Sequence, residues 1–514
     1  MKKLTDDEIL KLLSEPNGAE KIMALRVDTD ALYDSAVRLF IEKRAAAPLL
    51  LRLANKKRCL IEMSGNEELI GAVGEALSSD APKLRRNAAR LAGCLKTSGL
   101  TELLIKALDN EEQRFVRPSM LLALGSIGGE KAADYLKKYC VAPAADESER
   151  KHFSEESAAL VSALRETAPR VEHAFTGLKT IWTLELRCPD MLAHQLVEEL
   201  AELGLEAYDI RSSSVKIKTG DIDNLYNARC FREALFVIAN GVDTQPEAIA
   251  KKAVPMLLKL MHETHTGEPP FRFRVEMDIA CENRTELVRS IASAAEGQEL
   301  KNAPSDYEVE LRVEGSIKSC RLYAKLFTRK DKRFSYRAES IPASMDPSVA
   351  ASVLRLAQDY LIVNARVIDP CCGSGTFLIE RGLLSPCASL TGVDIAHKAI
   401  EVARRNTALS GVDAKYTVND ILRFVCHRPY DELICNLPFG NRVGTHSSCE
   451  ALYRGLIARL PELVRHGGIA ILYTMEFTLL KRIIRENEGR ITLLSQHRTE
   501  AGGLTPEIFI LRVE

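Results

Sequence analysis

The sequence predicts a multidomain α/β protein, with an N-terminal α-solenoid, a central α+β region and a C-terminal doubly wound sheet. Three observations lead to this prediction. The length of 514 residues exceeds what one ordinary hydrophobic core serves. A weak repeat with a 32-residue shift runs through the first 145 residues. From residue 350 onward strands alternate with helices, which is typical of a parallel sheet covered by helices.

The N-terminal repeat is visible when the sequence is slid by 32 positions, which places Gly93 on Gly125. We expect each unit to be a helix, a short turn that contains the glycine, and a second helix. Such helix pairs must stack, because one pair alone cannot bury its apolar side. Residues 1–150 resemble HEAT-type repeats, which implies a surface for a protein partner.

In the central region, strands and helices alternate over short spans. This alternation predicts two small α+β units, at residues 170–245 and 246–335. In the first unit we expect strands at 180–186, 214–218 and 234–238, with helices at 191–203 and 222–228. In the second we expect strands at 271–278, 307–313 and 320–327, with a helix at 284–295.

In residues 336–514 the alternation of strands and helices predicts the doubly wound sheet. Ligands of such a sheet bind beyond the carboxyl ends of its strands. The expected helices are 376–383 and 396–409, and the expected strands are 366–369, 390–394, 431–436 and 469–473. Residues 489–494 and 507–513 are expected to close the sheet as an antiparallel hairpin.

A glycine loop, Asp369-Pro-Cys-Cys-Gly-Ser-Gly-Thr376, follows the first of these strands. Gly373 and Gly375 permit a sharp turn and a close approach to a ligand, and the next helix directs its free N–H groups at that ligand. Asp394 ends the next strand, where its carboxylate can accept from ribose hydroxyls, and Asp420 can accept from an adenine amino group.

Two cofactors are compatible with such a loop. A dinucleotide prefers a third glycine, but Leu378 stands at that position. S-adenosylmethionine has no phosphate, and a loop that begins with an acid suits its cationic amino acid. We therefore expect S-adenosylmethionine, with Cys371 and Cys372 as small residues that line the loop. The expected cofactor contacts are Asp369, Pro370, Cys371, Gly373, Ser374, Gly375, Thr376, Asp394, Ile395, Asp420 and Ile421.

The tetrapeptide Asn436-Leu-Pro-Phe439 begins 16 residues after Asp420, at the end of a predicted strand. The nitrogen of a base amino group is poorly nucleophilic, because its lone pair is conjugated with the ring. If the side-chain oxygen of Asn436 and the carbonyl of Leu437 accept its protons, the lone pair turns toward the methyl donor. Pro438 stiffens the turn, and Phe439 offers a face to an extruded base. These four residues are the expected catalytic set, and a strand-ending turn with a buried phenylalanine is the alternative.

A basic segment precedes the predicted sheet. Residues 321–340 contain seven basic and two acidic residues, interleaved with Phe327, Phe334 and Tyr336. Cations beside aromatic faces suit structured, partly single-stranded RNA, whereas a solvated charged hairpin is the alternative. The expected RNA contacts are Arg329, Lys330, Lys332, Arg333, Arg337 and Arg442.

The glycine loop and the tetrapeptide, together with the approach segment 341–347, resemble the THUMP-domain RNA methyltransferases that make N2-methylguanosine. The resemblance covers residues 165–514. It implies a ferredoxin-like domain at 170–245, a THUMP-like RNA-binding domain at 246–335 and a class I methyltransferase domain at 336–514. It also implies a guanosine in structured RNA as substrate, in tRNA before ribosomal RNA.

Two departures from that family and three alternatives accompany the resemblance. The family often has proline where Leu437 stands, and its usual architecture has no helical repeats at the start. The same tetrapeptide also serves N6-adenine methylation and methylation of a glutamine side chain. A non-catalytic RNA-binding scaffold is the alternative from a different functional class.

Composition limits the functional classes to which the protein can belong. The formal net charge is −1, so a nucleic-acid surface must be local. The 13 cysteines contain no CxxC pair, so we expect neither a metal site nor a disulfide framework. The charged start and the lack of a run of about 18 apolar residues favour a cytoplasmic protein without a membrane anchor.

Overall fold

The computed structural model describes residues 4–25, 27–144, 147, 149–167, 172–342, 344–439, 446–500 and 503–514. It divides into two compact units, Met1–Arg170 and Val171–Glu514. Each unit has its own hydrophobic core, and each is described separately below.

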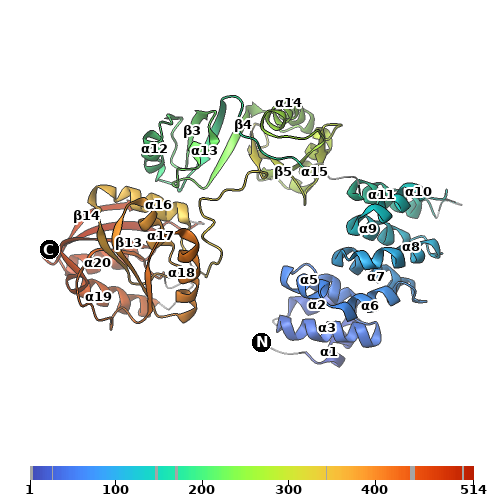
Figure 1. Ribbon diagram of the computed structural model, residues 1–514, viewed down its shortest axis with the longest axis horizontal. Helices are drawn as coiled ribbons and strands as arrows, with labels where there is room; N and C mark the ends of the chain where they lie inside the picture. Colours follow the sequence, from blue (N-terminus) through green and yellow to red (C-terminus); the bar gives the residue numbers. More distant parts are fainter. Residues whose placement is uncertain are drawn as a thin grey trace. The chain divides into compact units, whose positions relative to one another are not determined.

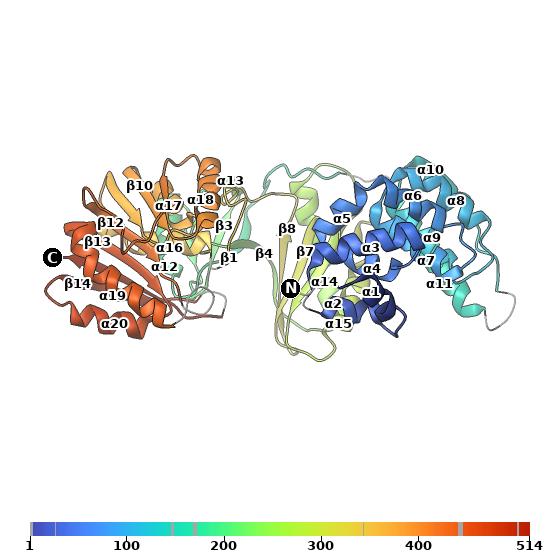
Figure 2. The same ribbon diagram turned by 90° about the horizontal axis from the view of Figure 1, so that it is seen from below.

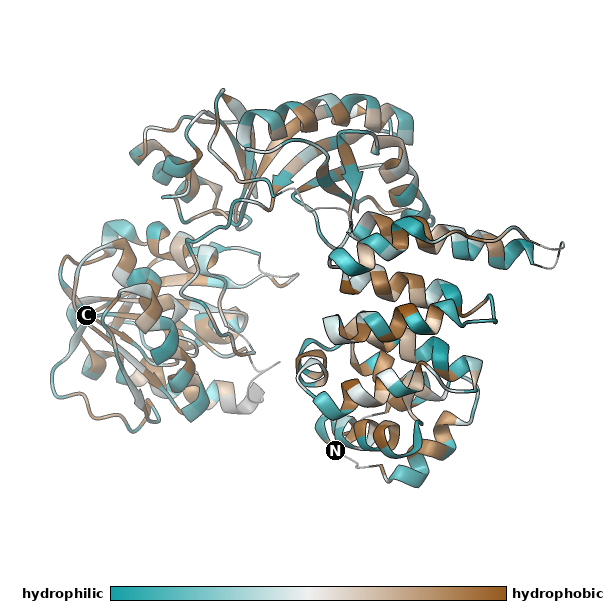
Figure 3. Ribbon diagram, turned by 45° about the vertical axis from the view of Figure 1, so that its right-hand side comes forward, coloured by the Kyte–Doolittle hydropathy of each residue, from teal (hydrophilic) through white to brown (hydrophobic). Residues whose placement is uncertain are grey.

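The first unit is built of helices stacked in layers (Figure 1). The helices are α1 (Asp6–Leu13), α2 (Gly18–Ala24), α3 (Thr29–Lys43), α4 (Ala47–Leu53), α5 (Lys57–Ser64), α6 (Glu67–Ala76), α7 (Pro82–Leu95), α8 (Thr101–Asp109), α9 (Arg117–Ile127), α10 (Glu130–Lys138) and α11 (Arg150–Thr167). Helices α2, α4, α7, α9 and α11 contact one another in succession as one row, and Figure 3 places hydrophobic residues between the stacked helices. The predicted stacking of helix pairs is therefore confirmed.

The repeated glycines lie inside helices, not in the turns where we expected them. A Cβ on Gly93 in α7 would stand 3.3 Å from the Cα of Ala123 in α9. A Cβ on Gly125 in α9 would stand 2.6 Å from the Cα of Ala163 in α11, which no real side chain tolerates. Both glycines therefore mark places where neighbouring helices of the row touch. The turn after α9 uses Gly128, whose φ is +69°.

The second unit contains an eight-stranded sheet in the order β2-β3-β1-β4-β8-β7-β5-β6. The strands are β1 (Trp182–Arg187), β2 (Ala207–Tyr208), β3 (Ser214–Thr219), β4 (Glu233–Val242), β5 (Phe271–Asp278), β6 (Leu300–Asn302), β7 (Val309–Gly315) and β8 (Cys320–Leu326). Strand β4 pairs with β1 through its first half and with β8 through its second half. The two predicted α+β units therefore share one sheet, which we did not expect.

Helices cover this central sheet in two groups (Figure 1). They are α12 (Ala193–Glu202) and α13 (Ile222–Leu225) in the first predicted unit, and α14 (Pro246–Thr264) and α15 (Arg284–Ala295) in the second. Helix α14 packs on β4 and β8, and α15 on β5 and β6. One continuous core runs under both groups. Helix α14 and the short strands β2 and β6 were not predicted.

The rest of the second unit is a seven-stranded sheet in the order β11-β10-β9-β12-β13-β15-β14. Its strands are β9 (Ala365–Asp369), β10 (Cys387–Asp394), β11 (Lys415–Val418), β12 (Tyr430–Asn436), β13 (Val464–Thr474), β14 (Ile491–Arg498) and β15 (Glu507–Val513). The first five strands in this order are parallel, whereas β15 is antiparallel to both of its neighbours. The predicted doubly wound sheet and its closing hairpin are confirmed, and the sheet is mixed.

Helices lie on both faces of the seven-stranded sheet (Figure 2). They are α16 (Pro347–Leu356), α17 (Thr376–Leu384), α18 (His397–Ser410), α19 (His446–Leu463) and α20 (Phe477–Glu486). Side chains alternate along β12, so that Leu433 and Cys435 join the core with α19 and α20, and Ile434 joins the core with α17 and α18. The carboxyl ends of the parallel strands remain uncovered by these helices and carry the loops described next.

The described part of the chain contains neither a membrane-spanning helix nor a metal-binding cluster. No helix there has the length and apolar character that crossing a membrane requires. No cluster of three or more histidine, cysteine or acidic side chains there is arranged to hold a metal ion.

Candidate active site

The glycine loop lies at the carboxyl end of β9 and leads into α17. Gly373 and Gly375 have φ angles of +52° and +80°, in the left-handed region that favours glycine. A Cβ on Gly375 would stand 2.7 Å from the hydroxyl of Tyr416, which fills the space beneath the loop. Gly375 is therefore required by packing inside the domain, whereas we had expected the ligand to require it. A Cβ on Gly373 would meet only Ile341, at 3.8 Å.

Asp394, at the end of β10, holds the glycine loop in place. Its carboxylate accepts from the N–H of Gly373 at 2.9 Å and from the N–H of Ala396, also at 2.9 Å. In addition, the N–H of Cys372 donates to the carbonyl of Val393 at 3.0 Å. A carboxylate has about four acceptor positions, so Asp394 retains capacity for the hydroxyls of a ribose.

Asp369 is the first residue of the loop and is a buried acid, with 1% of its surface exposed. Its side chain accepts from the N–H of Cys371 at 3.1 Å. Burial, and secondarily the negative charge of Asp394, raises the pKa of Asp369 to about 8. Within the described residues no lysine, arginine or histidine lowers the pKa of Asp369. A cationic ligand group in the loop would favour the ionised form of Asp369.

The neighbouring strand ends offer an apolar and a polar contact for a nucleoside. Ile395 directly follows Asp394 and is 73% exposed, which is high for an apolar side chain beside a polar loop. Asp420 is half-buried, and one of its oxygens accepts from the N–H of Leu422 at 2.9 Å. Cys371 is half-buried. The side chains of four other predicted contacts are buried: Pro370, Ser374, Thr376 and Ile421.

Strand β12 lies beside β9, with Leu433 opposite Ile368, so both strands end at the same edge of the sheet. Asn436 is the last residue of β12 and is half-buried. The N–H of Leu437 donates to the carbonyl of Tyr473 at 2.9 Å, and the Leu437 side chain is buried in the core. Only the main chain of Leu437 is thus left to contact a ligand, which fits the expectation that its carbonyl alone is needed.

The turn after Asn436 is fixed by residues that the sequence did not indicate. The hydroxyl of Tyr453 donates to the carbonyl of Pro438 at 2.9 Å, and the thiol of Cys449 contacts the same oxygen at 3.5 Å. Both residues come from α19 and have no recognisable spacing relative to the tetrapeptide. The ring of Phe439 lies 6.1 Å from that of Tyr473, at an interplanar angle of 42°.

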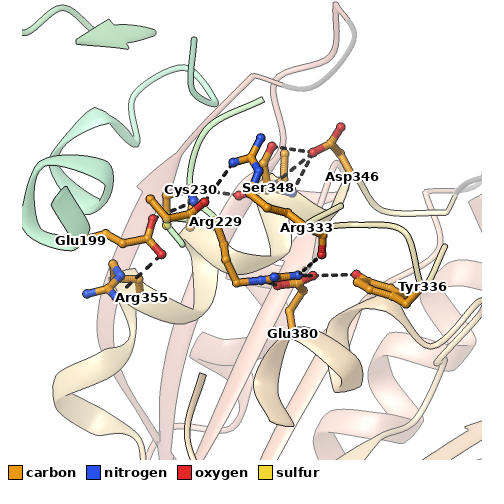
Figure 4. Close-up of polar contacts among 12 residues, drawn as sticks. Glu199, Arg229, Cys230, Arg333, Tyr336, Asp346, Ser348, Arg355 and Glu380 are labelled. Atoms are coloured by element: carbon orange, nitrogen blue, oxygen red, sulfur yellow. Dashed lines mark hydrogen bonds and ion pairs between the residues drawn. The ribbon is translucent and has the colours of Figure 1, made fainter. Parts of the chain in front are cut away.

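Arg333, a predicted RNA contact, points into the protein (Figure 4), with 3% of its side chain exposed. Its guanidinium donates to the carbonyls of Ala228 and Phe231 at 2.9 and 3.0 Å. It also pairs with Asp331 at 2.7 Å. Because these partners occupy the group inside the protein, Arg333 is an interior contact, and its assignment to an RNA surface is corrected.

The other predicted RNA contacts separate into two groups. Arg329 pairs with Asp223 at 2.7 Å and stacks 3.8 Å from the ring centre of Tyr226, so it too is engaged by the protein. Lys330 and Lys332 are exposed, and Arg337 is half-buried. Arg442 lies outside the described residues.

Two family models match the chain. Residues 335–503, which include the glycine loop and the tetrapeptide, match the RMKL-like methyltransferase domain. Residues 71–151 match HEAT repeats, which confirms that part of the predicted solenoid.

Known proteins resemble parts of the chain. A tRNA (guanine(6)-N2)-methyltransferase from Thermus thermophilus is 28% identical over 222 residues, which are 41% of this chain and 62% of the relative. A ribosomal protein uL3 glutamine methyltransferase from Bradyrhizobium diazoefficiens is 31% identical over 155 residues, 29% of this chain and 42% of the relative. The chain thus spans less than two thirds of both relatives.

Among solved structures, TrmN from Thermus thermophilus has a TM-score of 0.53 at 24% identity, over 65% of this chain and 100% of that chain. That likeness establishes a shared fold. Residues 335–503 thus match an RMKL-like methyltransferase domain, and the likeness to this structure shows the fold.

Proposed function

We propose that this chain is an RNA methyltransferase that transfers a methyl group from S-adenosylmethionine to the exocyclic N2 of a guanosine, in tRNA before ribosomal RNA. One observation carries the proposal. Asn436 and the glycine loop follow neighbouring parallel strands, β12 and β9, and so flank the same edge of the sheet. A methyl donor in the loop and an amine beside Asn436 would therefore be close enough to react.

The residues of the loop suit this cofactor. Asp369 gains a counter-ion from the cationic amino acid, Asp394 accepts from the ribose, and Asp420 accepts from the adenine amino group. The exposed side chain of Ile395 provides an apolar surface for the adenine ring. When bound, S-adenosylmethionine supplies an electrophilic methyl group on a sulfonium.

Asn436 and Leu437 act on the amine. The side-chain oxygen of Asn436 and the carbonyl of Leu437 accept hydrogen bonds from its two N–H groups, which turns the nitrogen lone pair out of conjugation with the ring. The nitrogen loses one proton to solvent after it has gained the methyl group. Because the carbonyl of Pro438 is held by Tyr453, the turn that presents these acceptors is fixed before the base arrives. Catalysis then comes mainly from positioning, with preorganised dipoles as the second contribution. Phe439 stacks on the extruded base.

The central region binds the RNA. We assign residues 170–245 to a ferredoxin-like domain, 246–335 to a THUMP-like domain and 336–514 to the methyltransferase domain. The exposed Lys330 and Lys332 are the basic residues of the predicted segment that remain available to phosphates. The helical repeats at 1–150 dock a protein partner, and the protein acts in the cytoplasm.

Mass spectrometry of nucleosides tests the proposal. Total tRNA from cells that lack the gene is incubated with the protein and S-adenosylmethionine, and N2-methylguanosine is the expected product. Asn436→Ala should lower turnover by about 100- to 1,000-fold, while the affinity for S-adenosylhomocysteine stays the same. Asn110→Ala, the same change at an exposed site in the helical unit, is the matched control.

The competing functions give different results in the same assay. If the product is N6-methyladenosine, the target base is adenine and not guanine. Methylglutamine in added ribosomal proteins, with unmodified RNA, would favour the activity named for the Bradyrhizobium relative. RNA binding without any methyl transfer would identify a scaffold, and unchanged activity of Asn436→Ala would remove this residue from the mechanism.

A further inference from the structure

Helix α17, which begins at the glycine loop, is connected to the central sheet by a buried ion pair (Figure 4). The guanidinium of Arg229 donates to both carboxylate oxygens of Glu380, at 2.7 and 2.8 Å. The hydroxyl of Tyr336 donates to the same carboxylate at 2.6 Å. The Glu380 side chain is completely buried. Arg229 lies just before β4, and Tyr336 lies in the segment that joins β8 to α16.

The joining segment is folded into the same contact. Arg229 also donates to the carbonyl of Arg333 at 3.0 Å, and Arg333 in turn donates to the carbonyls on either side of Arg229, those of Ala228 and Phe231. We call Arg229, Arg333, Tyr336 and Glu380 the interdomain clasp. It ties three stretches of chain together through charge-assisted hydrogen bonds, which are the more directional and stronger kind.

Helix α17 does not depend on the clasp for its own position. Arg381, the residue after Glu380, forms a second buried pair with Glu432 on β12, at 2.8 and 3.0 Å. Both of these side chains are completely buried. The glycine loop and the strand that ends in Asn436 are therefore held together inside the methyltransferase domain. What the clasp fixes is the central sheet relative to that domain.

Other contacts also join the two parts, so loss of the clasp would not separate them. Arg355 of α16 pairs with Glu202 of α12 at 2.6 Å. The hydroxyl of Thr499 donates to the carbonyl of Asp190 at 2.7 Å. Leu192 also packs into the core of the methyltransferase domain, and Ala351 of α16 into that of the central sheet. We expect these contacts to keep the parts attached when the clasp no longer holds α17 to the central sheet.

We propose that the interdomain clasp is a positioning device, which sets the central sheet in the orientation that brings a base of the bound RNA to Asn436. This inference rests on the proposed function. The clasp residues touch neither substrate nor cofactor, so they are positioning residues. Misplacement of a reacting group by about 1 Å costs roughly 100-fold in rate. The clasp therefore acts on RNA turnover and not on cofactor affinity.

The test separates positioning from stability by use of a double variant. Arg229→Met leaves the buried Glu380 without its cation, and Glu380→Gln leaves the half-buried Arg229 without its carboxylate, so each single change destabilises the fold. The variant with both changes removes the two charges together, and we expect its melting temperature to recover toward that of the wild type. Its kcat/KM on total tRNA from cells that lack the gene should stay about 100-fold low, with affinity for S-adenosylhomocysteine unchanged. Tyr336→Phe, which removes only a hydroxyl, should lower kcat/KM by a smaller factor.

Arg512→Met with Glu514→Gln removes a partly exposed ion pair within the methyltransferase domain and serves as the control. A double clasp variant with wild-type kcat/KM overturns the inference, as does a loss of cofactor affinity in parallel with turnover. A wild-type protein that leaves guanosine unmodified rejects the proposed function and this role with it. If the wild type is active and the double clasp variant is equally active, the proposed function stands and only the positioning role of the clasp is rejected.

Discussion

Two kinds of contact hold helices in place, small residues that allow close approach and buried ion pairs. The first unit has both, since Arg114 pairs with the buried Glu156 of α11 at 2.9 Å. In the first unit, small residues let helices touch, as Gly125 of α9 does with Ala163 of α11. In the second unit, α17 is attached by charge, through Glu380 to the central sheet and through Arg381 to β12. Glycine contacts recur along a repeat and can be found in the sequence. The ion pairs of α17 join residues far apart in the chain, 151 positions for the first and 51 for the second.

The largest effect is expected where one buried charge loses its partner. Arg381→Met leaves the buried Glu432 side chain without its cationic partner, with the N–H of Ile362 still donating to it. Breaking a buried pair in this way costs roughly 3–5 kcal/mol. Urea unfolding followed by circular dichroism measures the loss. Arg381→Met combined with Glu432→Gln should cost less than Arg381→Met alone, and a single-variant loss below about 1 kcal/mol would mean that water reaches the pair.

The helical unit should respond to the size of a side chain as well as to its charge. Gly125→Ala places a methyl group against the backbone of Ala163, and such overpacking costs about 1–3 kcal/mol. Gly71→Ala in α6 is the matched control, because no atom lies within 4 Å of the added methyl. The control should gain up to about 1 kcal/mol from helix propensity. Calorimetric melting compares them, and equal effects would show that α9 and α11 separate easily.

The third predicted effect comes from the buried acid Asp369, and it depends on pH. The unfolded chain has the ordinary aspartate pKa of 3.8, whereas burial raises the pKa of Asp369 to about 8 in the folded protein. The folded state therefore binds this proton more tightly, so its contribution is complete below the unfolded value. It is lost as pH rises between the two pKa values, by at most about 1.4 kcal/mol per pH unit.

Asp369→Asn removes that dependence. We expect the free energy of unfolding of the cofactor-free wild type to fall relative to Asp369→Asn as pH rises through this interval. Urea unfolding at several pH values measures the difference. A difference that does not change with pH would mean that Asp369 is ionised in the folded protein throughout.

The sequence predicted that the glycine loop and Asn436 lie at one edge of the sheet, because topology determines where loops lie. The carboxyl ends of parallel strands share one edge of a sheet, so the glycine loop and Asn436 had to flank the same edge. Nothing in the sequence indicated that Tyr453 and Cys449 hold the carbonyl of Pro438, because that contact depends on how α19 packs on the sheet.

For the basic segment at residues 321–340, the prediction from sequence was wrong in part. Its charges and aromatic rings predicted an RNA surface, yet Arg333 lies inside the protein and Lys332, one residue earlier, is exposed. Composition counts charges but does not say which of them the fold buries. Burial is decided by contacts with Ala228 and Phe231, about 100 residues earlier in the chain.

By itself the sequence determined the order of the elements, the repeated helices, the glycine loop and the strand that ends in Asn436. These follow from local periodicity and from the few connections that a parallel sheet allows. Only the tertiary structure decided that β4 joins both halves of the central region in one sheet, and that Glu380 and Arg381 bind different partners. Such long-range pairings depend on which surfaces meet when the elements pack, and local patterns do not encode that choice.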